Sequence, residues 1–127
     1  MRLGFIVILS SLLKSGRKTL FTSGGDYTML LNDIVACGPH GFFFEPLTDI
    51  AAFAERYGRT HAFIGNADTR ILLHETQDAI RREVKRCLDI GKKYPGFCMA
   101  VRNQIPPNTP VEKILYHNVR YEEISRR

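Results

Sequence analysis

Six polar residues stand just after apolar runs or a glycine turn of the sequence, and their types suit hydrogen bonding to an anionic substrate. An arginine can hold a carboxylate through two parallel hydrogen bonds, and amide side chains can donate to the same oxygens. A glycine before such residues lets the backbone come close to a ligand. The pattern identifies no catalytic residue. The candidates for substrate binding are Asp26, Asn66, Asp68, Arg102, Asn103 and Gln104.

Each candidate also has a structural interpretation. Asp26 can cap a following helix, and Asp68 can stabilise the turn before Ile71, as aspartates commonly do. Asn66 faces the same choice as Asp68. For Asn103 and Gln104, a polar loop is an equal alternative to a binding role.

The elements that position these residues alternate along the chain. Short apolar runs predict strands over 19–22, 41–44, 61–65 and 97–101, and helical spacing predicts helices over 3–13, 27–37, 50–57, 76–91 and from 110 onward. The predicted order is one helix followed by four strand–helix units. Such an order gives a parallel sheet with right-handed crossovers. A flavodoxin-like open sheet and half of an eight-unit barrel both satisfy it.

Caps and apolar stripes sharpen the helix boundaries. Asp49 and Thr76 are predicted N-caps, and Thr109-Pro110-Val111-Glu112 has the composition of a capping box. Two helices have apolar faces that we expect to be buried. These faces are Ile80, Val84, Cys87 and Leu88 in one helix, and Val111, Ile114, Leu115 and Val119 in the other.

Length and composition indicate one globular domain over residues 1–127. The chain has 44% hydrophobic and 24% charged residues and a net charge of +5. Acids interleave with the bases along 78–89, which is typical of a solvated helix face, and no nucleic-acid motif is present. We expect no nucleic-acid partner.

Two further features bear on the cellular location. Arg2 and the apolar run over 3–13 have the form of a secretory signal, but no small-residue cleavage site follows, so we favour a buried helix ending at Gly16. The run is too short to cross a bilayer. Cys37, Cys87 and Cys98 lack metal-ligand spacing and indicate reduced thiols, with Cys37 and Cys98 as small buried residues. We therefore expect a cytoplasmic protein with no membrane contact.

Three loop segments carry a resemblance to a known family. Phe21-Thr22-Ser23-Gly24-Gly25-Asp26 and Gly65-Asn66-Ala67-Asp68 are similar to the segments after the fifth and seventh strands of the uroporphyrinogen decarboxylase family. Pro107-Asn108-Thr109-Pro110-Val111-Glu112 is similar to the start of its last helix. The resemblance implies strands five to eight of a (β/α)₈ barrel, which usually needs about 250 residues and has its site at the carboxyl ends of the strands.

The resemblance also implies a choice of chemistry. Family members include a cofactor-free porphyrinogen decarboxylase of haem biosynthesis and corrinoid-dependent methyltransferases that use zinc. Thr22 and Gly24 stand where the methyltransferases have histidine and cysteine, and residues 102–104 lack the later cysteine. Thr and Gly are not zinc ligands, so we expect no metal or other cofactor. Arg102 stands where the family tends to have glycine, so it could obstruct the pocket.

The family's arginine-rich loop and catalytic aspartate belong to the first half of the barrel. The resemblance therefore implies loss of decarboxylation in this chain alone, with a tetrapyrrole or a corrinoid-linked molecule as the ancestral substrate. A half-barrel also leaves strand edges unpaired. A non-catalytic module that pairs with a second copy, or with a chain carrying the first half of the barrel, is the alternative function.

Overall fold

The computed structural model describes residues 2–101 and 104–126 as six α-helices, one 3₁₀ helix and four strands. In chain order the elements are α1 (Arg2–Lys14), β1 (Leu20–Thr22), η1 (Thr28–Leu30), α2 (Leu31–Ala36), β2 (Gly41–Phe43), α3 (Ile50–Tyr57), β3 (Ala62–Ile64), α4 (Arg70–His74), α5 (Gln77–Gly91), β4 (Phe97–Cys98) and α6 (Val111–Ser125).

The four strands form one parallel sheet in the order β1-β2-β3-β4. This sequential order confirms the half-barrel prediction and excludes a flavodoxin-like order, in which the second strand would lie outside the first. The fourth strand is shorter than predicted, since regular pairing ends at Cys98 and a single bridge joins Ala67 to Val101.

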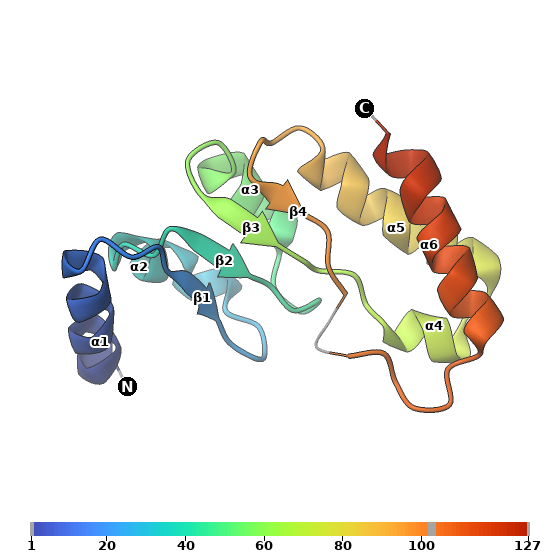
Figure 1. The fold of residues 1–127 in the computed structure, drawn as a ribbon, viewed down its shortest axis with the longest axis horizontal. Coiled ribbons are helices and arrows are strands. Elements are labelled where there is room, and N and C mark those ends of the chain that lie inside the picture. Colours follow the sequence, from blue (N-terminus) through green and yellow to red (C-terminus); the bar gives the residue numbers. More distant parts are fainter. Residues whose placement is uncertain (1, 102–103, 127) are drawn as a thin grey trace.

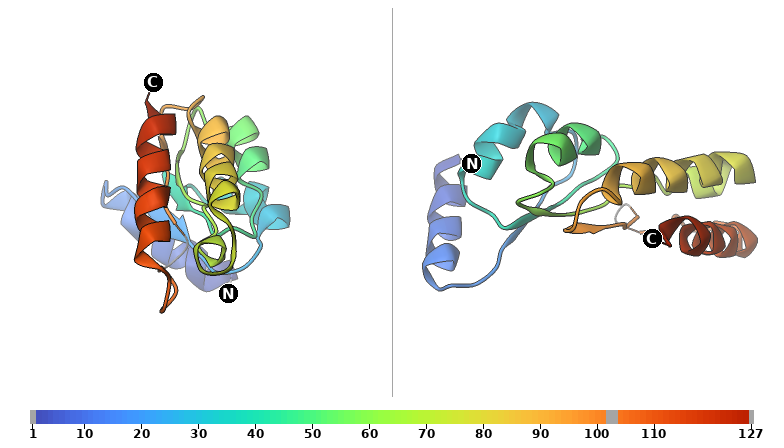
Figure 2. Two further views of the ribbon diagram at one scale, coloured as in Figure 1. Left: turned by 90° about the vertical axis from the view of Figure 1, so that its right-hand side faces the viewer. Right: turned by 90° about the horizontal axis from the view of Figure 1, so that it is seen from above.

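One face of the sheet is covered by α2, α3 and α5, while α1 lies at the β1 edge and α6 at the β4 edge (Figures 1 and 2). The core between sheet and helices is aromatic. Phe42, Phe44, Phe53 and Phe63 are all 0% exposed, and Phe53 of α3 joins the other three. No helix within the described residues covers the opposite face.

The predicted caps are confirmed at two helices. Ala52 N donates to Asp49 Oδ1, and Ala79 N donates to Thr76 Oγ1, each at the first turn of its helix. The buried stripe of α5 is also as predicted, with Ile80, Val84, Cys87 and Leu88 all buried.

The prediction of a capping box at the last helix is wrong. Thr109 Oγ1 donates to Pro106 O at 2.6 Å, so it closes a turn before the helix, and Pro110 takes the N-cap position without a side-chain bond. The expected apolar face of α6 is largely in solvent, with Val111 66%, Leu115 59% and Val119 45% exposed. Within the described chain, no helix is both long and apolar enough to cross a membrane.

Candidate functional site

Hydrogen bonds tie together the loops that follow β1, β2 and β3, at the carboxyl ends of the strands. Thr48, which is 1% exposed, lies at their centre. Its hydroxyl accepts from Tyr27 N and donates to Gly25 O, both at 3.3 Å, and its carbonyl accepts from Asn66 Nδ2 at 3.0 Å. We call the chain of bonds through Gly25, Thr48 and Asn66 the loop belt. It fixes three loops that would otherwise be independent.

Asn66 is the most deeply placed of the six candidates. It is 1% exposed, and its Nδ2 also donates to Glu45 O at 3.2 Å. Its Oδ1 accepts from Arg86 Nη2 at 3.1 Å. Because both donors and the acceptor of the amide are engaged within the protein, Asn66 holds the loops in place. Direct contact with a substrate stays a prediction.

Two charged residues of α5 support the loop after β3. Glu83 Oε1 accepts from Asp68 N at 3.0 Å, and Arg86 Nη2 donates to Glu83 Oε1 at 2.7 Å and to Asn66 O at 3.2 Å. The hydrogen bond to Glu83 raises the pKa of Arg86. The sequence pattern predicts a solvated helix face for both residues. The available signal was their spacing of three residues beside the buried stripe of α5.

Asp68 takes the turn role and also orients a cation. Its Oδ1 accepts from Arg70 N at 3.0 Å, which closes the turn at the start of α4. Arg70 Nε and Nη2 donate to the same carboxylate at 2.9 Å and 2.6 Å. This paired geometry raises the pKa of Arg70, whose side chain is 57% exposed. Arg70 was missed from the sequence, although it is a fixed, accessible cation on the side of the sheet where the strands end.

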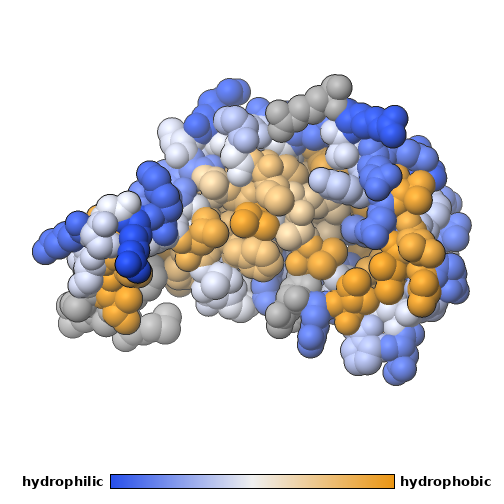
Figure 3. Space-filling model, in the orientation of Figure 1, coloured by the Kyte–Doolittle hydropathy of each residue, from blue (hydrophilic) through white to orange (hydrophobic). Residues whose placement is uncertain are grey.

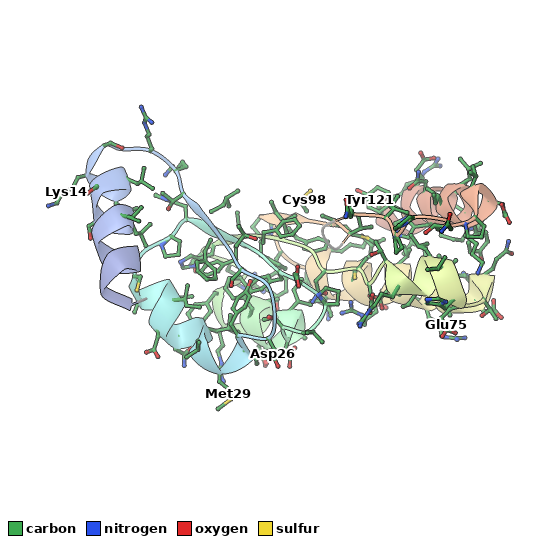
Figure 4. All side chains as sticks on the ribbon, turned by 90° about the horizontal axis from the view of Figure 1, so that it is seen from below. Lys14, Asp26, Met29, Glu75, Cys98 and Tyr121 are labelled. Carbon is green, nitrogen blue, oxygen red and sulfur yellow. The ribbon has the colours of Figure 1, made fainter. Side chains whose placement is uncertain are left out.

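Asp26 lies in the loop after β1 and is exposed. Its Oδ1 accepts from Thr28 N at 2.9 Å and from Thr28 Oγ1 at 2.6 Å, and the bond to the Thr28 side chain lowers the pKa of Asp26. The predicted helix cap is off by one residue, because Tyr27 stands at the N-cap of η1. Figure 4 shows Asp26 at the margin of the molecule, beside η1.

The chain after β4 reaches the same region through its backbone. Gln104 O accepts from Thr69 Oγ1 at 3.3 Å, while Gln104 is itself exposed. The loops after β3 and β4 are therefore in contact. Arg102 and Asn103 lie outside the described residues, and their binding roles stay predictions.

The cysteines and histidines do not provide a metal centre in the described parts of the chain. No group of three or more His, Cys, Asp or Glu side chains converges there. Burial raises the pKa of the Cys87 thiol to about 11. Cys98 was predicted to be buried but is exposed, because it lies on the sheet face without helices (Figure 4). Thr22 and Gly24 offer neither imidazole nor thiolate, so the donor set does not fit the zinc of the methyltransferase branch.

A groove of about 240 Å³ separates α6 from the segment after β4, and its lining residues are Met99, Ala100, Val101, His117, Asn118 and Tyr121. Within the described residues, His117 Nε2 is buried without a hydrogen-bond partner. Burial lowers the pKa of His117, against smaller opposing effects from the hydrogen bond with Asn118 and from Glu83 on α5. A protonated His117 would place a largely desolvated charge on the buried side of α6.

Acidification is therefore expected to weaken the fold through His117. The unfolded-state pKa is about 6.5 and the folded-state pKa is lower. Below the unfolded-state value, the unfolded chain binds more protons than the folded one, so stability falls as the pH drops towards the folded-state pKa. Urea midpoints measured at neutral and mildly acidic pH should show a smaller decrease in His117→Gln than in wild type. His74→Gln, at an exposed histidine, should retain the wild-type decrease; equal decreases in all three proteins would contradict the assignment.

Comparison with known proteins agrees with this architecture. The profile of the family described as uroporphyrinogen decarboxylase (URO-D) matches residues 8–117. No curated protein sequence matches the chain. Among solved structures, a methyltransferase from Methanosarcina mazei is similar with a TM-score of 0.71 and 23% identity, over 95% of this chain and 36% of that chain. The chain thus spans little more than a third of that protein, and at this identity the likeness concerns the fold. With the profile covering most of its length, the chain belongs to the uroporphyrinogen decarboxylase family.

Proposed function

We propose that this chain forms half of the substrate-binding mouth of a uroporphyrinogen-decarboxylase-type barrel and does not catalyse decarboxylation alone. The observation that carries the proposal is the Asp68–Arg70 pair, which the bond from Asp68 N to Glu83 Oε1 holds at the carboxyl ends of the strands, next to the loop belt. Barrel enzymes place their chemistry at that end of the strands.

The substrate class follows from the residues displayed there. Arg70 is positively charged at any physiological pH, and its guanidinium is oriented by Asp68 while more than half of the side chain remains in solvent. Such a group suits a carboxylate at the rim of the mouth. A tetrapyrrole with carboxylate side chains is the ligand class that this arrangement and the family support best.

Loss of turnover follows from what a half-barrel can assemble. Catalysis needs groups from several strand ends in one geometry. The described residues include four strands of the eight that a closed barrel requires. The zinc-dependent methyltransferase function is less well supported, because the donor set at Thr22 and Gly24 does not fit the metal.

Turnover and binding can be measured separately. Anaerobic incubation with uroporphyrinogen is expected to yield no coproporphyrinogen above the rate without protein. Binding of uroporphyrin, followed by fluorescence quenching, should weaken by about tenfold in Arg70→Gln, as loss of one charged hydrogen-bonding group predicts.

Arg81→Gln is the matched control, because it removes the same charge from an exposed position on α5. It should bind uroporphyrin as wild type does. Equal weakening in both variants would indicate only non-specific charge attraction. Absence of binding, or measurable decarboxylation by the chain alone, would contradict the proposal.

A further inference from the structure

The sheet face without helices is apolar and open. The strand register aligns Leu20, Gly41 and Ala62 in one row, and Thr22, Phe43, Ile64 and Cys98 in the next. These side chains point away from the aromatic core, because Phe42 and Phe63, which alternate with them, are fully buried on the helix side. Leu20 is 58% exposed. Figure 3 shows apolar surface across the middle of this face.

Both edges of the sheet, beside β1 and beside β4, carry further apolar surface. Beside β1, a hollow of about 100 Å³ is lined mainly by Ile8, Leu9, Leu12, Leu20 and Phe21. Beside β4 lies the groove under α6. On α6 itself, the exposed Val111, Leu115 and Val119 recur every four residues and form one stripe, which Figure 3 shows at the end of the molecule opposite α1.

The directions of the strands restrict which strand can pair with β1 or β4 at these two edges. In a closed eight-stranded barrel, the strand that follows β4 must run parallel to it. A second copy of this chain, rotated about an axis along the barrel, brings its β1 beside β4 in the required direction. The same rotation brings its β4 beside the first β1, so two identical contacts close the ring.

The charges at the two edges of the sheet are opposite in sign and lie at the same level along the strand direction. Lys14 at the end of α1, and Arg17 and Lys18 between α1 and β1, are exposed where the strands begin. The carboxyl end of α6 lies at the same level, because Lys92 Nζ, just after α5 and before β4, donates to Ile124 O at 2.7 Å. That end of α6 carries the exposed Glu122 and Glu123, of which Glu123 already pairs with Arg120. In the ring, these acids would face the basic segment of the other copy.

We propose that two copies of the chain pair edge to edge to form a closed eight-stranded barrel, with the α6 stripe of each copy against α1 and β1 of the other. What the mouth of this dimer binds rests on the proposed function. In the dimer, two Asp68–Arg70 pairs stand on opposite sides of one mouth, related by the two-fold axis. Such a mouth suits a ring-shaped ligand with carboxylates around its rim.

Light scattering after size exclusion tests the assembly without any ligand, so its result is distinguishable from that of the porphyrin-binding experiment. Wild type should have twice the mass of the chain over a wide concentration range. Leu115→Glu should weaken the dimer by at least about tenfold, since it puts a charge into the apolar contact. Leu115 is 59% exposed in the single chain, so the variant should keep the wild-type circular dichroism spectrum.

Met29→Glu is the control, because Met29 is 93% exposed on η1 and points away from both edges of the sheet (Figure 4). It should remain a dimer. Glu122→Lys should weaken the dimer, and Lys18→Glu in the same chain should restore it. A monomeric wild type, a mass above that of a dimer, or a dimer that Leu115→Glu leaves intact would overturn the proposal. So would a monomer that associates only with a different chain carrying the first half of the barrel.

Discussion

Replacing Phe53 with alanine is expected to lower the free energy of unfolding by about 3–5 kcal/mol. Phe53 is 0% exposed, and its ring lies 4.8 Å from that of Phe42, 4.7 Å from that of Phe44 and 5.6 Å from that of Phe63, between centroids. Removing the ring leaves a cavity where α3 packs on the sheet. Urea unfolding followed by circular dichroism measures the change.

Met29→Ala provides the matched control. Met29 is a large apolar residue that is 93% exposed, so its truncation should change the free energy of unfolding by less than about 0.5 kcal/mol. If both variants lost the same small amount, the aromatic cluster would not be the core of this fold.

The fold could be predicted from local patterns because its determinants are local. The continuous apolar run at 41–44 predicts a strand, although one covered on both faces and not on one, and the stripe of α5 indicates a helix packed on one side. Asp49 and Thr76 satisfy the first turns of their own helices, so their role is encoded within three residues. The strand order, in contrast, needed the family resemblance, since alternation alone fits two topologies.

The spacing of Glu83 and Arg86 indicates that they pair with each other, but their bonds to the loop after β3 could not be predicted, because those partners are far away in the sequence. Arg86 donates to Asn66 O, and Glu83 accepts from Asp68 N. A pattern of side chains does not encode such bonds, so both residues have the composition of a solvated face. Arg70 was missed for a related reason, because its orientation depends on the turn that Asp68 makes.

The errors in burial have a single physical origin. Cys98, Val111 and Leu115 belong to apolar patterns and are nevertheless exposed. Periodicity predicts which face of an element is apolar, but burial requires a neighbouring element to cover it. For the open sheet face and for the α6 stripe, no described element of this chain does so.

Replacing Asn66 with leucine is expected to lower the free energy of unfolding by about 2–4 kcal/mol, since each buried group left unpaired costs about 1–3 kcal/mol. The substitution keeps the branched shape of the side chain, but it removes the amide group that donates to Glu45 O and Thr48 O and accepts from Arg86 Nη2. Hydrogen exchange should quicken most in the loops of the belt, at 45–49 and 65–69. Gln77→Leu, at an exposed amide at the start of α5, should change neither quantity.

A double-mutant cycle with Arg86→Met separates the contribution of the Asn66–Arg86 hydrogen bond from that of side-chain packing. If Asn66 and Arg86 act through their shared bond, Asn66→Leu should destabilise the Arg86→Met protein less than it destabilises wild type. The difference should be about 0.5–3 kcal/mol, the range found for residues in one hydrogen-bond network. Additive losses would show instead that the two side chains stabilise the loops independently. In that case the carbonyls of Glu45 and Thr48, held by Asn66 alone, would be what fixes the mouth.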